Sequence, residues 1–196
     1  MLYEIHRYPS DLIDVMHVER DGVRRRVVVR PVLPQDDAPT AAFFAKLSGE
    51  ARRSRFMSPV REVSPWLIKS FTRVDYQAHV ALVAEVFEDG VETVIAEVRY
   101  VRLDDGRSAE FAVTVADGWQ GLGIARQLLS KLACHAQNAG VERLVGEALA
   151  SNAPMLTLAR KAGFVLTTDP ELRGVVRFER NLPAGARRAP CGASAA

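Results

Sequence analysis

The stretch Trp119-Gln120-Gly121-Leu122-Gly123-Ile124-Ala125-Arg126 decides how this chain of 196 residues is organised. It stands between a β-branched run that ends at Val115 and an apolar stripe typical of a helix, which continues to Ala139. Glycines at such a junction let backbone N–H groups converge on one point, and the helix N-terminus adds a partial positive charge. The stretch therefore predicts a site for a phosphate or pyrophosphate. Two glycines are equally consistent with a tight turn that binds nothing.

Two common phosphate loops do not fit this stretch. A dinucleotide-binding loop needs a third glycine where Arg126 stands, and it follows an N-terminal parallel βαβ unit that is missing here. A Walker A loop needs Gly-Lys followed by Ser or Thr, which is also missing. The loop is therefore expected to belong to another class of phosphate-binding fold.

Strand and helix patterns alternate on both sides of this stretch. The expected strands are 27–32, 79–87, 91–102, 108–115, 142–147, 164–168 and 175–180. The expected helices are 34–47, 49–56, 64–72, 121–139 and 152–162. Asp89-Gly90 and Asp104-Asp105-Gly106 predict hairpin turns between strands. The order predicts an α/β (α+β) fold with a central mixed, mostly antiparallel sheet of about seven strands, flanked by helices.

Composition narrows the class of protein. The formal net charge is +2, from 26 Lys and Arg against 24 Asp and Glu, so no overall charge favours nucleic acid or an anionic membrane. No apolar stretch approaches the ~20 residues of a membrane span, and the first residues lack a signal-peptide core. The four histidines and two cysteines show no metal-ligand spacing, so no metal is expected. These features predict a cytoplasmic protein, in which Cys134 is a buried, inert thiol.

The chain is expected to hold one domain with two appendages. Residues 27–182 carry the strand and helix patterns and form the predicted domain. Residues 1–26 mix charges with short apolar pieces and are expected to be an N-terminal extension. Residues 183–196 are mostly Pro, Gly, Ala and Arg with little to bury, so a disordered tail is expected.

Two motifs resemble those of GCN5-related N-acetyltransferases, the GNAT family. Gln120-x-x-Gly123-x-Ala125 is similar to that family's acetyl-CoA signature, Q/R-x-x-G-x-G/A, and it follows a strand and opens a helix as the family requires. Downstream, Asn152 precedes a helix that ends in 161–164, Lys-Ala-Gly-Phe, which resembles the family's Asn and K-x-G-F segment. The resemblance covers roughly Val27 to Leu182, and it implies a GNAT fold.

Three further segments resemble one branch of that family. Residues 47–56, 109–113 and 146–150 look like the catalytic domain of bacterial protein lysine acetyltransferases of the Pat type. This implies acetyl-CoA as the acyl donor and a primary amine as the acceptor. It also implies that the free edge of the strand near Phe111 to Val113 binds the pantetheine arm, with backbone N–H groups facing the thioester oxygen. The residues implied to bind acetyl-CoA are Val113, Val115, Gln120, Gly121, Leu122, Gly123, Ile124, Ala125, Arg126, Asn152, Leu158 and Lys161.

Glu110 is the candidate catalytic residue. On an alternating strand it shares one face with the small side chains Ala112 and Thr114, which suits the floor of a cleft. An amine must lose a proton before it attacks, because the pKa of a free lysine is near ~10.4. A carboxylate in a partly desolvated cleft can take that proton, and the Glu of this Ala-Glu-Phe motif resembles the general base of Pat-type domains. The alternative is a surface glutamate paired with Arg99 or Arg102.

The acceptor and the fate of the thiolate stay open at this stage. Many members of the family place a tyrosine as general acid where this chain has Ala159, and no tyrosine follows Tyr100. A protein lysine is the first choice of acceptor and a small-molecule amine is the second. A non-catalytic acetyl-CoA-binding regulatory module is the alternative from another class. A monomer or a homodimer is expected, with no nucleic acid and no membrane as partner.

Overall fold

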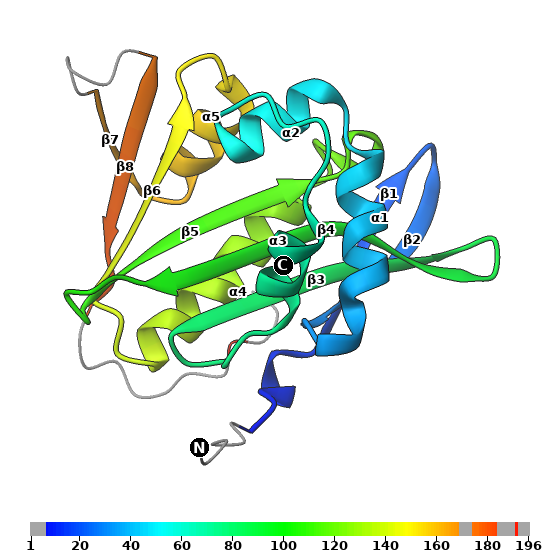
Figure 1. Ribbon diagram of the computed structural model, residues 1–196, viewed down its shortest axis with the longest axis horizontal. Coiled ribbons are helices and arrows are strands. Elements are labelled where there is room, and N and C mark those ends of the chain that lie inside the picture. The colour runs from blue at the N-terminus through cyan, green and yellow to red at the C-terminus, as the bar shows by residue number, and fades with distance from the viewer. Residues whose placement is uncertain (1–6, 169–173, 184–190, 192–196) are drawn as a thin grey trace.

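Three consecutive antiparallel strands, β3 (His79–Glu88), β4 (Val91–Arg102) and β5 (Ser108–Val115), form the middle of the computed structural model (Figure 1). The structure describes residues 7–168, 174–183 and 191. The predicted turn at Asp89-Gly90 joins β3 to β4, and both residues have positive φ, as a two-residue hairpin turn requires. Strand β3 is buried on both faces from 80 to 86, in agreement with its nearly continuous apolar sequence.

Within the described residues, the sheet has eight strands in the order β1-β2-β3-β4-β5-β6-β8-β7. Every neighbouring pair is antiparallel except β5 and β6, which run parallel. The predicted mixed, mostly antiparallel sheet is therefore confirmed, with one strand more than expected. The remaining strands are β1 (Asp14–Arg20), β2 (Val23–Pro31), β6 (Arg143–Leu149), β7 (Val165–Thr168) and β8 (Val175–Asn181).

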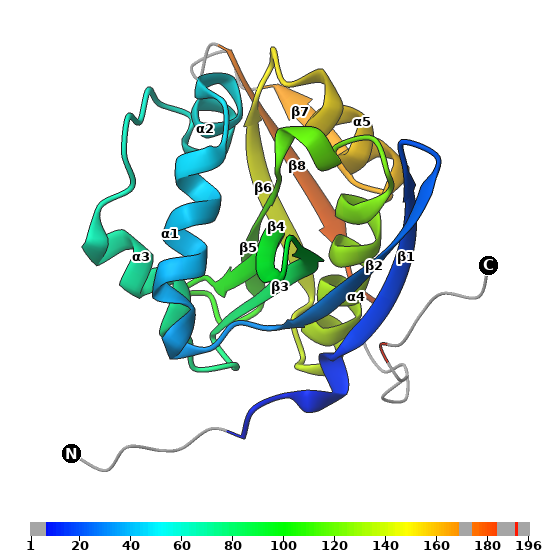
Figure 2. The ribbon, with the colours of Figure 1, turned by 90° about the vertical axis from the view of Figure 1, so that its right-hand side faces the viewer.

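Helices cover both faces of the sheet. Helices α1, α2 and α3 lie on one face, and α4 and α5 lie on the other (Figure 2). Their bounds are α1 (Asp37–Lys46), α2 (Gly49–Phe56), α3 (Pro65–Thr72), α4 (Ile124–Asn138) and α5 (Ala153–Lys161). Short 3-10 turns stand at η1 (Ser10–Leu12), η2 (Pro34–Asp36) and η3 (Asp117–Trp119). The predicted stripe of α4, which includes Leu128, Leu129 and Leu132, is buried in the larger of two hydrophobic cores.

The strand missing from the sequence-based expectation is β1. It pairs with β2 along Asp14–Val29, through a turn at Asp21-Gly22 in which both residues have positive φ. Only Val18 of β1 is buried, so the strand lacks a clear apolar alternation. The expected boundary at residue 26 thus falls inside β2. Residues 14–26 belong to the sheet and are not a separate extension.

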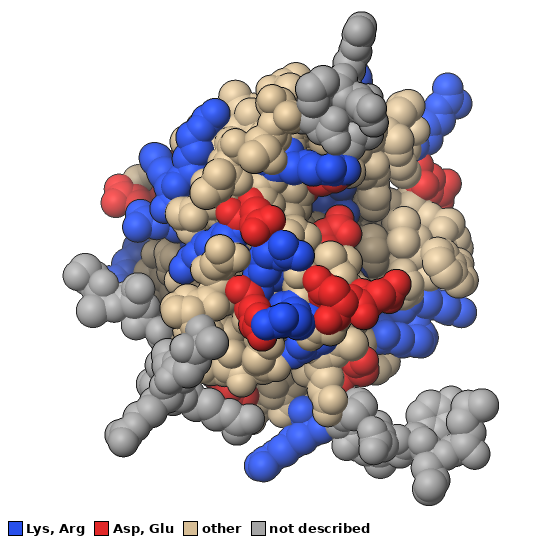
Figure 3. Space-filling model, turned by 90° about the vertical axis from the view of Figure 1, so that its left-hand side faces the viewer, with Lys and Arg blue, Asp and Glu red and all other residues tan. Residues whose placement is uncertain are grey.

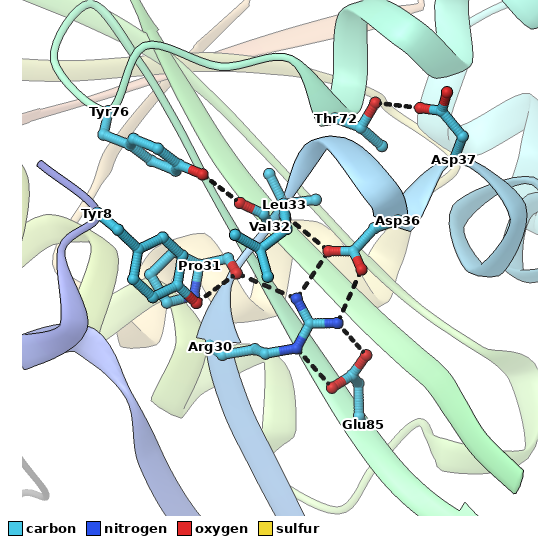
Figure 4. A network of polar contacts seen from close by, with 10 residues as sticks. All are labelled: Tyr8, Arg30, Pro31, Val32, Leu33, Asp36, Asp37, Thr72, Tyr76 and Glu85. Atoms are coloured by element: carbon cyan, nitrogen blue, oxygen red, sulfur yellow. Dashed lines mark hydrogen bonds and ion pairs between the residues drawn. The ribbon is translucent and has the colours of Figure 1, made fainter. Parts of the chain in front are cut away.

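A buried ionic network fixes β2 against β3 and against the start of α1 (Figure 4). The Arg30 guanidinium donates to both carboxylate oxygens of Glu85 at 2.8 and 2.6 Å, and to both of Asp36 at 2.7 and 3.0 Å. Asp36 also accepts from the Leu33 N–H at 2.7 Å. Burial lowers the pKa of Arg30, but the hydrogen bonds with Asp36 and Glu85 outweigh burial and raise that pKa above its usual value. The network therefore holds a permanent positive charge between two carboxylates.

Cys134 is joined by a disulfide to Cys191, so the prediction of a free, inert thiol is wrong. The buried Lys131 of α4 donates to the Cys191 carbonyl at 2.7 Å and forms a 2.9 Å ion pair with Asp14 of β1. These contacts join α4, β1 and the C-terminal segment. The rest of the predicted disordered tail, apart from Pro183, lies outside the described residues. Among the described helices, none has the length and apolarity to cross a membrane.

Candidate functional site

The sheet opens between β5 and β6. Strand β5 pairs with β6 only from Ser108 to Glu110, whereas its pairing with β4 continues to Val115. Figure 1 shows the two strands starting side by side and then diverging, with α2 near the wide end of the gap. Residues 111–115 of β5 therefore form a strand edge inside the sheet.

The direction of the backbone groups along this edge follows from one hydrogen bond. The Ala116 N–H donates to the Ile95 carbonyl of β4 at 2.8 Å. Because backbone groups alternate in direction along a strand, those of Val113 and Val115 point away from β4 and into the gap. The Val115 carbonyl indeed accepts from the Gln120 side chain at 3.1 Å. Val113 thus presents its backbone N–H and carbonyl to the gap, and Val115 presents its N–H there.

The glycine loop, residues 117–123, connects this edge to α4. Gly121 and Gly123 have φ values of 77° and 80°, in the left-handed region that glycine adopts without a steric penalty. The space in front of both Cα atoms is open, since a Cβ added at either would meet no atom within 4 Å. Side chains cap the N-termini of α2, α3 and α5, but within the described residues no side chain caps α4. The first N–H groups of α4 therefore remain available to an anion.

Contacts from distant parts of the sequence hold the glycine loop in place. Asp117 accepts the Ser48 N–H at 2.9 Å and the Ser48 hydroxyl at 2.7 Å, and Ser48 is the N-cap of α2. Burial raises the pKa of Asp117, but the hydrogen bonds from Ser48 outweigh burial and hold that pKa below its usual value. On the other side, the Arg20 guanidinium of β1 stacks over the Trp119 ring at 4.4 Å. The loop is thus braced by α2 and by the strand that the sequence analysis missed.

Glu110 lines a cavity of about 350 Å³ on the α2 face of the sheet. Its side chain is exposed and makes no hydrogen bond or ion pair with any described residue. The other two carboxylates of the cavity are paired, Glu147 with Arg177 at 2.7 Å and Glu179 with Arg143 at 3.7 Å. Lys and Arg side chains accordingly alternate with Asp and Glu over the side of the molecule that carries β6, β7 and β8 (Figure 3).

Arg99, one of the two arginines expected as an alternative partner of Glu110, belongs to a buried ionic cluster. Arg99 donates from Nε to Glu97 at 2.6 Å and from Nη1 to His79 at 3.0 Å. Arg55 of α2 extends into the same cluster, 3.9 Å from Glu97. Arg102, the other alternative, donates to backbone carbonyls, including that of Ala139. Neither arginine neutralises Glu110.

Three of the residues predicted to bind acetyl-CoA lie in or next to helix α5, and each has different surroundings. The Asn152 side chain accepts the Met155 N–H at 3.1 Å and so acts as the N-cap of α5. Leu158 is partly buried against the larger core. Lys161 lies at the helix end and lines a second cavity together with Arg126 of α4. Ala159, where a general acid was sought, is fully buried and holds no proton donor.

The structure places Glu110 where β5 stops pairing with β6, and the glycine loop where β5 ends. It also adds residues that the sequence analysis missed. Arg20, which stacks on Trp119, and Arg180, which lines the same cavity as Lys161, lie far from the motifs in sequence, and no local pattern marks them. Pairs such as Glu147 and Arg177 become visible only through the register of β6 and β8. Within the described residues, no group of His, Cys, Asp or Glu is arranged to hold a metal ion.

Comparisons with known proteins agree with this geometry. A family model described as an acetyltransferase (GNAT) domain matches residues 26–165. The chain is 34% identical over 147 residues to Acetyltransferase PA5475 of Pseudomonas aeruginosa, a match that covers 75% of this chain and 79% of that protein. It is 34% identical over 156 residues to Acetyltransferase Pat of Mycolicibacterium smegmatis, covering 79% of this chain. It spans only 45% of the length of that second relative.

A solved structure has the same fold. The GNAT domain of the PAT protein from S. lividans superposes with a TM-score of 0.78 at 32% sequence identity. The match covers 90% of this chain and all of that domain. The shared fold therefore includes nearly the whole sheet and the helices on both of its faces.

Proposed function

The chain belongs to the acetyltransferase (GNAT) family, whose members use acetyl-CoA, and from this membership we propose that it transfers the acetyl group of acetyl-CoA directly to a primary amine. A lysine side chain of a protein is the proposed acceptor. The observation that carries the proposal is the position of Glu110, an unpaired carboxylate at the point where β5 separates from β6.

The residues around the gap fit acetyl-CoA. The open backbone edge at Val113 and Val115 matches the amide groups of a pantetheine arm, which can pair with it like an added strand. The start of α4 and the glycine loop suit the pyrophosphate, because no described side chain caps that helix and the space in front of Gly121 and Gly123 is open. When bound there, acetyl-CoA supplies an activated acetyl thioester.

The residues of the chain perform two tasks in the proposed mechanism. Glu110 accepts the proton that the acceptor amine must lose, because its carboxylate makes no hydrogen bond or ion pair with any described residue and so has a free oxygen for that proton. Backbone N–H groups of the β5 edge donate to the thioester oxygen as it gains negative charge. Ala159 supplies no proton to the departing thiolate, so water does so, or the thiolate leaves unprotonated because a thiol pKa of ~8.5 makes it a tolerable leaving group.

Two features support a lysine of a protein as the acceptor. The similar proteins include one named Pat and the GNAT domain of a second PAT protein. In addition, Glu110 is exposed in an open cavity whose other carboxylates are already paired with arginines. Such a site suits one amine on a protruding side chain better than a polyamine, which needs several unpaired carboxylates.

The test is to incubate the purified protein with acetyl-CoA and either a mixture of lysine-bearing proteins or a panel of small amines. Free thiol measures turnover, and mass spectrometry locates the acetyl group. We expect thiol release above hydrolysis and acetyl groups on lysine Nζ. Transfer to small amines alone would contradict the protein acceptor and favour the second choice.

A second candidate function follows from Ala159. A buried alanine in place of a general acid is compatible with a regulatory module that binds acetyl-CoA without turnover. Tight binding of acetyl-CoA with no thiol release over the full set of acceptors would favour this candidate over the enzyme.

A further inference from the structure

Helix α2 is the least firmly packed of the helices that the structure describes. None of its eight residues is fully buried, whereas α1, α3, α4 and α5 each bury at least two. The helix ends at Met57, whose φ of 52° lies in the left-handed region that residues with a side chain seldom adopt. A helix that buries so little apolar surface opens locally more readily than its neighbours. The order of α2 therefore depends on the contacts at its two ends.

Ser48 connects the start of α2 to the glycine loop through four hydrogen bonds. Its N–H and its hydroxyl donate to the Asp117 carboxylate at 2.9 and 2.7 Å. On the helix side, the Ser48 hydroxyl oxygen accepts the Ala51 N–H at 3.1 Å, and the Ser48 carbonyl accepts the Arg52 N–H at 3.0 Å. One residue thus joins the loop to the first turn of the helix. Any ligand that fixes Asp117 therefore also fixes that turn.

The other end of α2 lies over the face of the sheet that carries Glu110. Helix α2 contacts both β5 and β6, the strands that separate at Glu110. Arg55 extends inward to 3.9 Å from Glu97, and its guanidinium lies over the Phe71 ring at 5.4 Å. Burial lowers the pKa of Arg55, and the charges of Glu97 and Glu110 oppose that effect. The Arg55 Nε is buried without a hydrogen bond to any described residue, so charge and packing hold this end.

We propose that Ser48 is a positioning residue, through which acetyl-CoA bound at the glycine loop orders α2 over the face of Glu110. The inference rests on the proposed function, since it takes the glycine loop as the pyrophosphate site. Bound CoA restricts the loop, the restricted Asp117 holds Ser48, and Ser48 holds the first turn of α2. An acceptor that binds afterwards has less motion of α2 to suppress and therefore binds more tightly. The two binding sites are thereby coupled, and the coupling is reciprocal.

Hydrogen exchange of the full chain, measured by mass spectrometry with and without saturating CoA, tests the link. In the wild type we expect CoA to slow exchange at the start of α4 and also in α2. The effect in α2 should be roughly five- to tenfold, in the lower range of typical coupling between sites. Asp117→Ala removes the acceptor of both Ser48 donors and leaves the cap of α2 in place, so the effect in α2 should disappear while that in α4 remains. Ser48→Thr keeps the hydroxyl and should behave like the wild type.

The matched control is Ser64→Ala, which removes the N-cap of α3. The Ser64 hydroxyl accepts the Leu67 N–H at 3.2 Å, as the Ser48 hydroxyl caps α2, but within the described residues Ser64 makes no hydrogen bond with the glycine loop. This variant should lose the stability of a cap and still show slower exchange in α2 with CoA. Kinetics give a second measurement, with poly-L-lysine as the acceptor at saturating acetyl-CoA. Ser48→Ala should raise the KM for poly-L-lysine about fivefold, more than it lowers kcat.

Three results would overturn the proposal. The first is a wild type in which CoA slows exchange in α4 but not in α2, and the second is an effect in α2 that persists in Asp117→Ala. The third is an equal loss of the effect in Ser64→Ala, because that would show a general loss of stability. Failure of the proposed function gives different results. If CoA slows exchange in neither helix, the cofactor site and the link both fall, and if poly-L-lysine releases no thiol, hydrogen exchange still decides about the link.

Discussion

Glu110 differs from the other two carboxylates of its cavity because it forms no ion pair with any described residue, although Arg55 of α2 acts on it electrostatically. We expect Glu110→Gln to keep the shape of the side chain while removing the ability to accept a proton. Turnover should fall by ~10²–10⁴-fold, the usual contribution of a general base, and affinity for acetyl-CoA should stay nearly unchanged. The measurement is turnover and acetyl-CoA affinity from about pH 6 to 10, a range that spans the relevant reference pKa values.

The pH dependence makes this prediction specific. High pH supplies free amine without help from the protein, so the deficit of Glu110→Gln should shrink as pH rises. The exposed Glu92 of β4 provides the control, and Glu92→Gln should behave like the wild type. Equal rates of Glu110→Gln and wild type over the whole range would remove Glu110 from the mechanism.

His79 makes the stability of the fold depend on pH. Burial lowers the pKa of His79 to about 4, and the adjacent Arg99 guanidinium lowers it further in the same direction. The unfolded chain binds this proton near pH ~6.5 and the folded chain only near pH 4, so stability should fall as pH decreases between these values. We expect a loss of roughly 1 kcal/mol between pH 7 and 5, after allowance for solvent screening of a partly buried group.

The contribution of His79 can be isolated by difference. Denaturant unfolding at pH 7 and pH 5 should show a smaller change for His79→Gln than for the wild type, because glutamine does not titrate but can still accept from Arg99. Other groups titrate equally in both proteins and cancel. An identical pH dependence of the two proteins would contradict the assignment.

The residues of the site were predictable from the sequence only where a motif fixed their surroundings. Gln120, Gly121 and Gly123 follow a strand and open a helix, so their role depends on local geometry alone. Glu110 does not pair with Arg99, because Arg99 instead donates to Glu97 and His79. Arg99 takes this orientation beside side chains of α2 and α3, which pack over the sheet. No pattern within β4 or β5 indicates that orientation.

At the scale of helices and strands, the start of α4 gives the most specific prediction, which concerns the binding of acetyl-CoA. Acetyl-CoA should raise the melting temperature of the wild type, because a ligand that binds only the folded state stabilises it. Gly123→Asp should abolish this shift by placing a side chain and a negative charge in the open space before the loop. The left-handed φ of 80° should also reduce the stability of the variant itself, by about 1 kcal/mol.

A matched control separates strain from ligand binding. Gly140, just beyond the other end of α4, has the same φ of 80° and the same open space around its Cα. Gly140→Asp should therefore lose stability and still show the shift with acetyl-CoA. An unshifted wild type at millimolar acetyl-CoA would contradict the cofactor site.

Most elements were predictable because their signals are local. Ser64-Pro65 predicted the start of α3, and the Ser64 hydroxyl does accept the Leu67 N–H at 3.2 Å. Asp89-Gly90 predicted the β3–β4 hairpin. Asp21-Gly22 carries the same turn signal, but the charged residues around it hide the alternation of β1, whose single buried residue is Val18. The missed strand is stabilised by its neighbours, through Lys131 and Trp119, which are distant in sequence.

At the scale of the whole molecule, the disulfide between Cys134 and Cys191 closes a segment of 57 residues. Cross-linking restricts the unfolded chain, so reduction should lower the free energy of unfolding by about 2–4 kcal/mol. The check is denaturant unfolding with and without a reductant. A variant with both Cys134→Ser and Cys191→Ser should be insensitive to the reductant. A wild type with equal stability in both conditions would contradict a structural role for the bond.

The opening between β5 and β6 also governs the order of events in catalysis. Helix α4 lies on one face of the sheet and α2 lies on the other (Figure 2), and Arg55 of α2 acts electrostatically on Glu110, so Glu110 is reached from the α2 face. Donor and acceptor can thus enter from opposite sides and meet in the opening, so neither has to leave before the other arrives. A ternary complex should form, and double-reciprocal plots of initial velocity should give intersecting lines. Parallel lines would instead indicate that the acetyl group is bound covalently to the protein between two half-reactions.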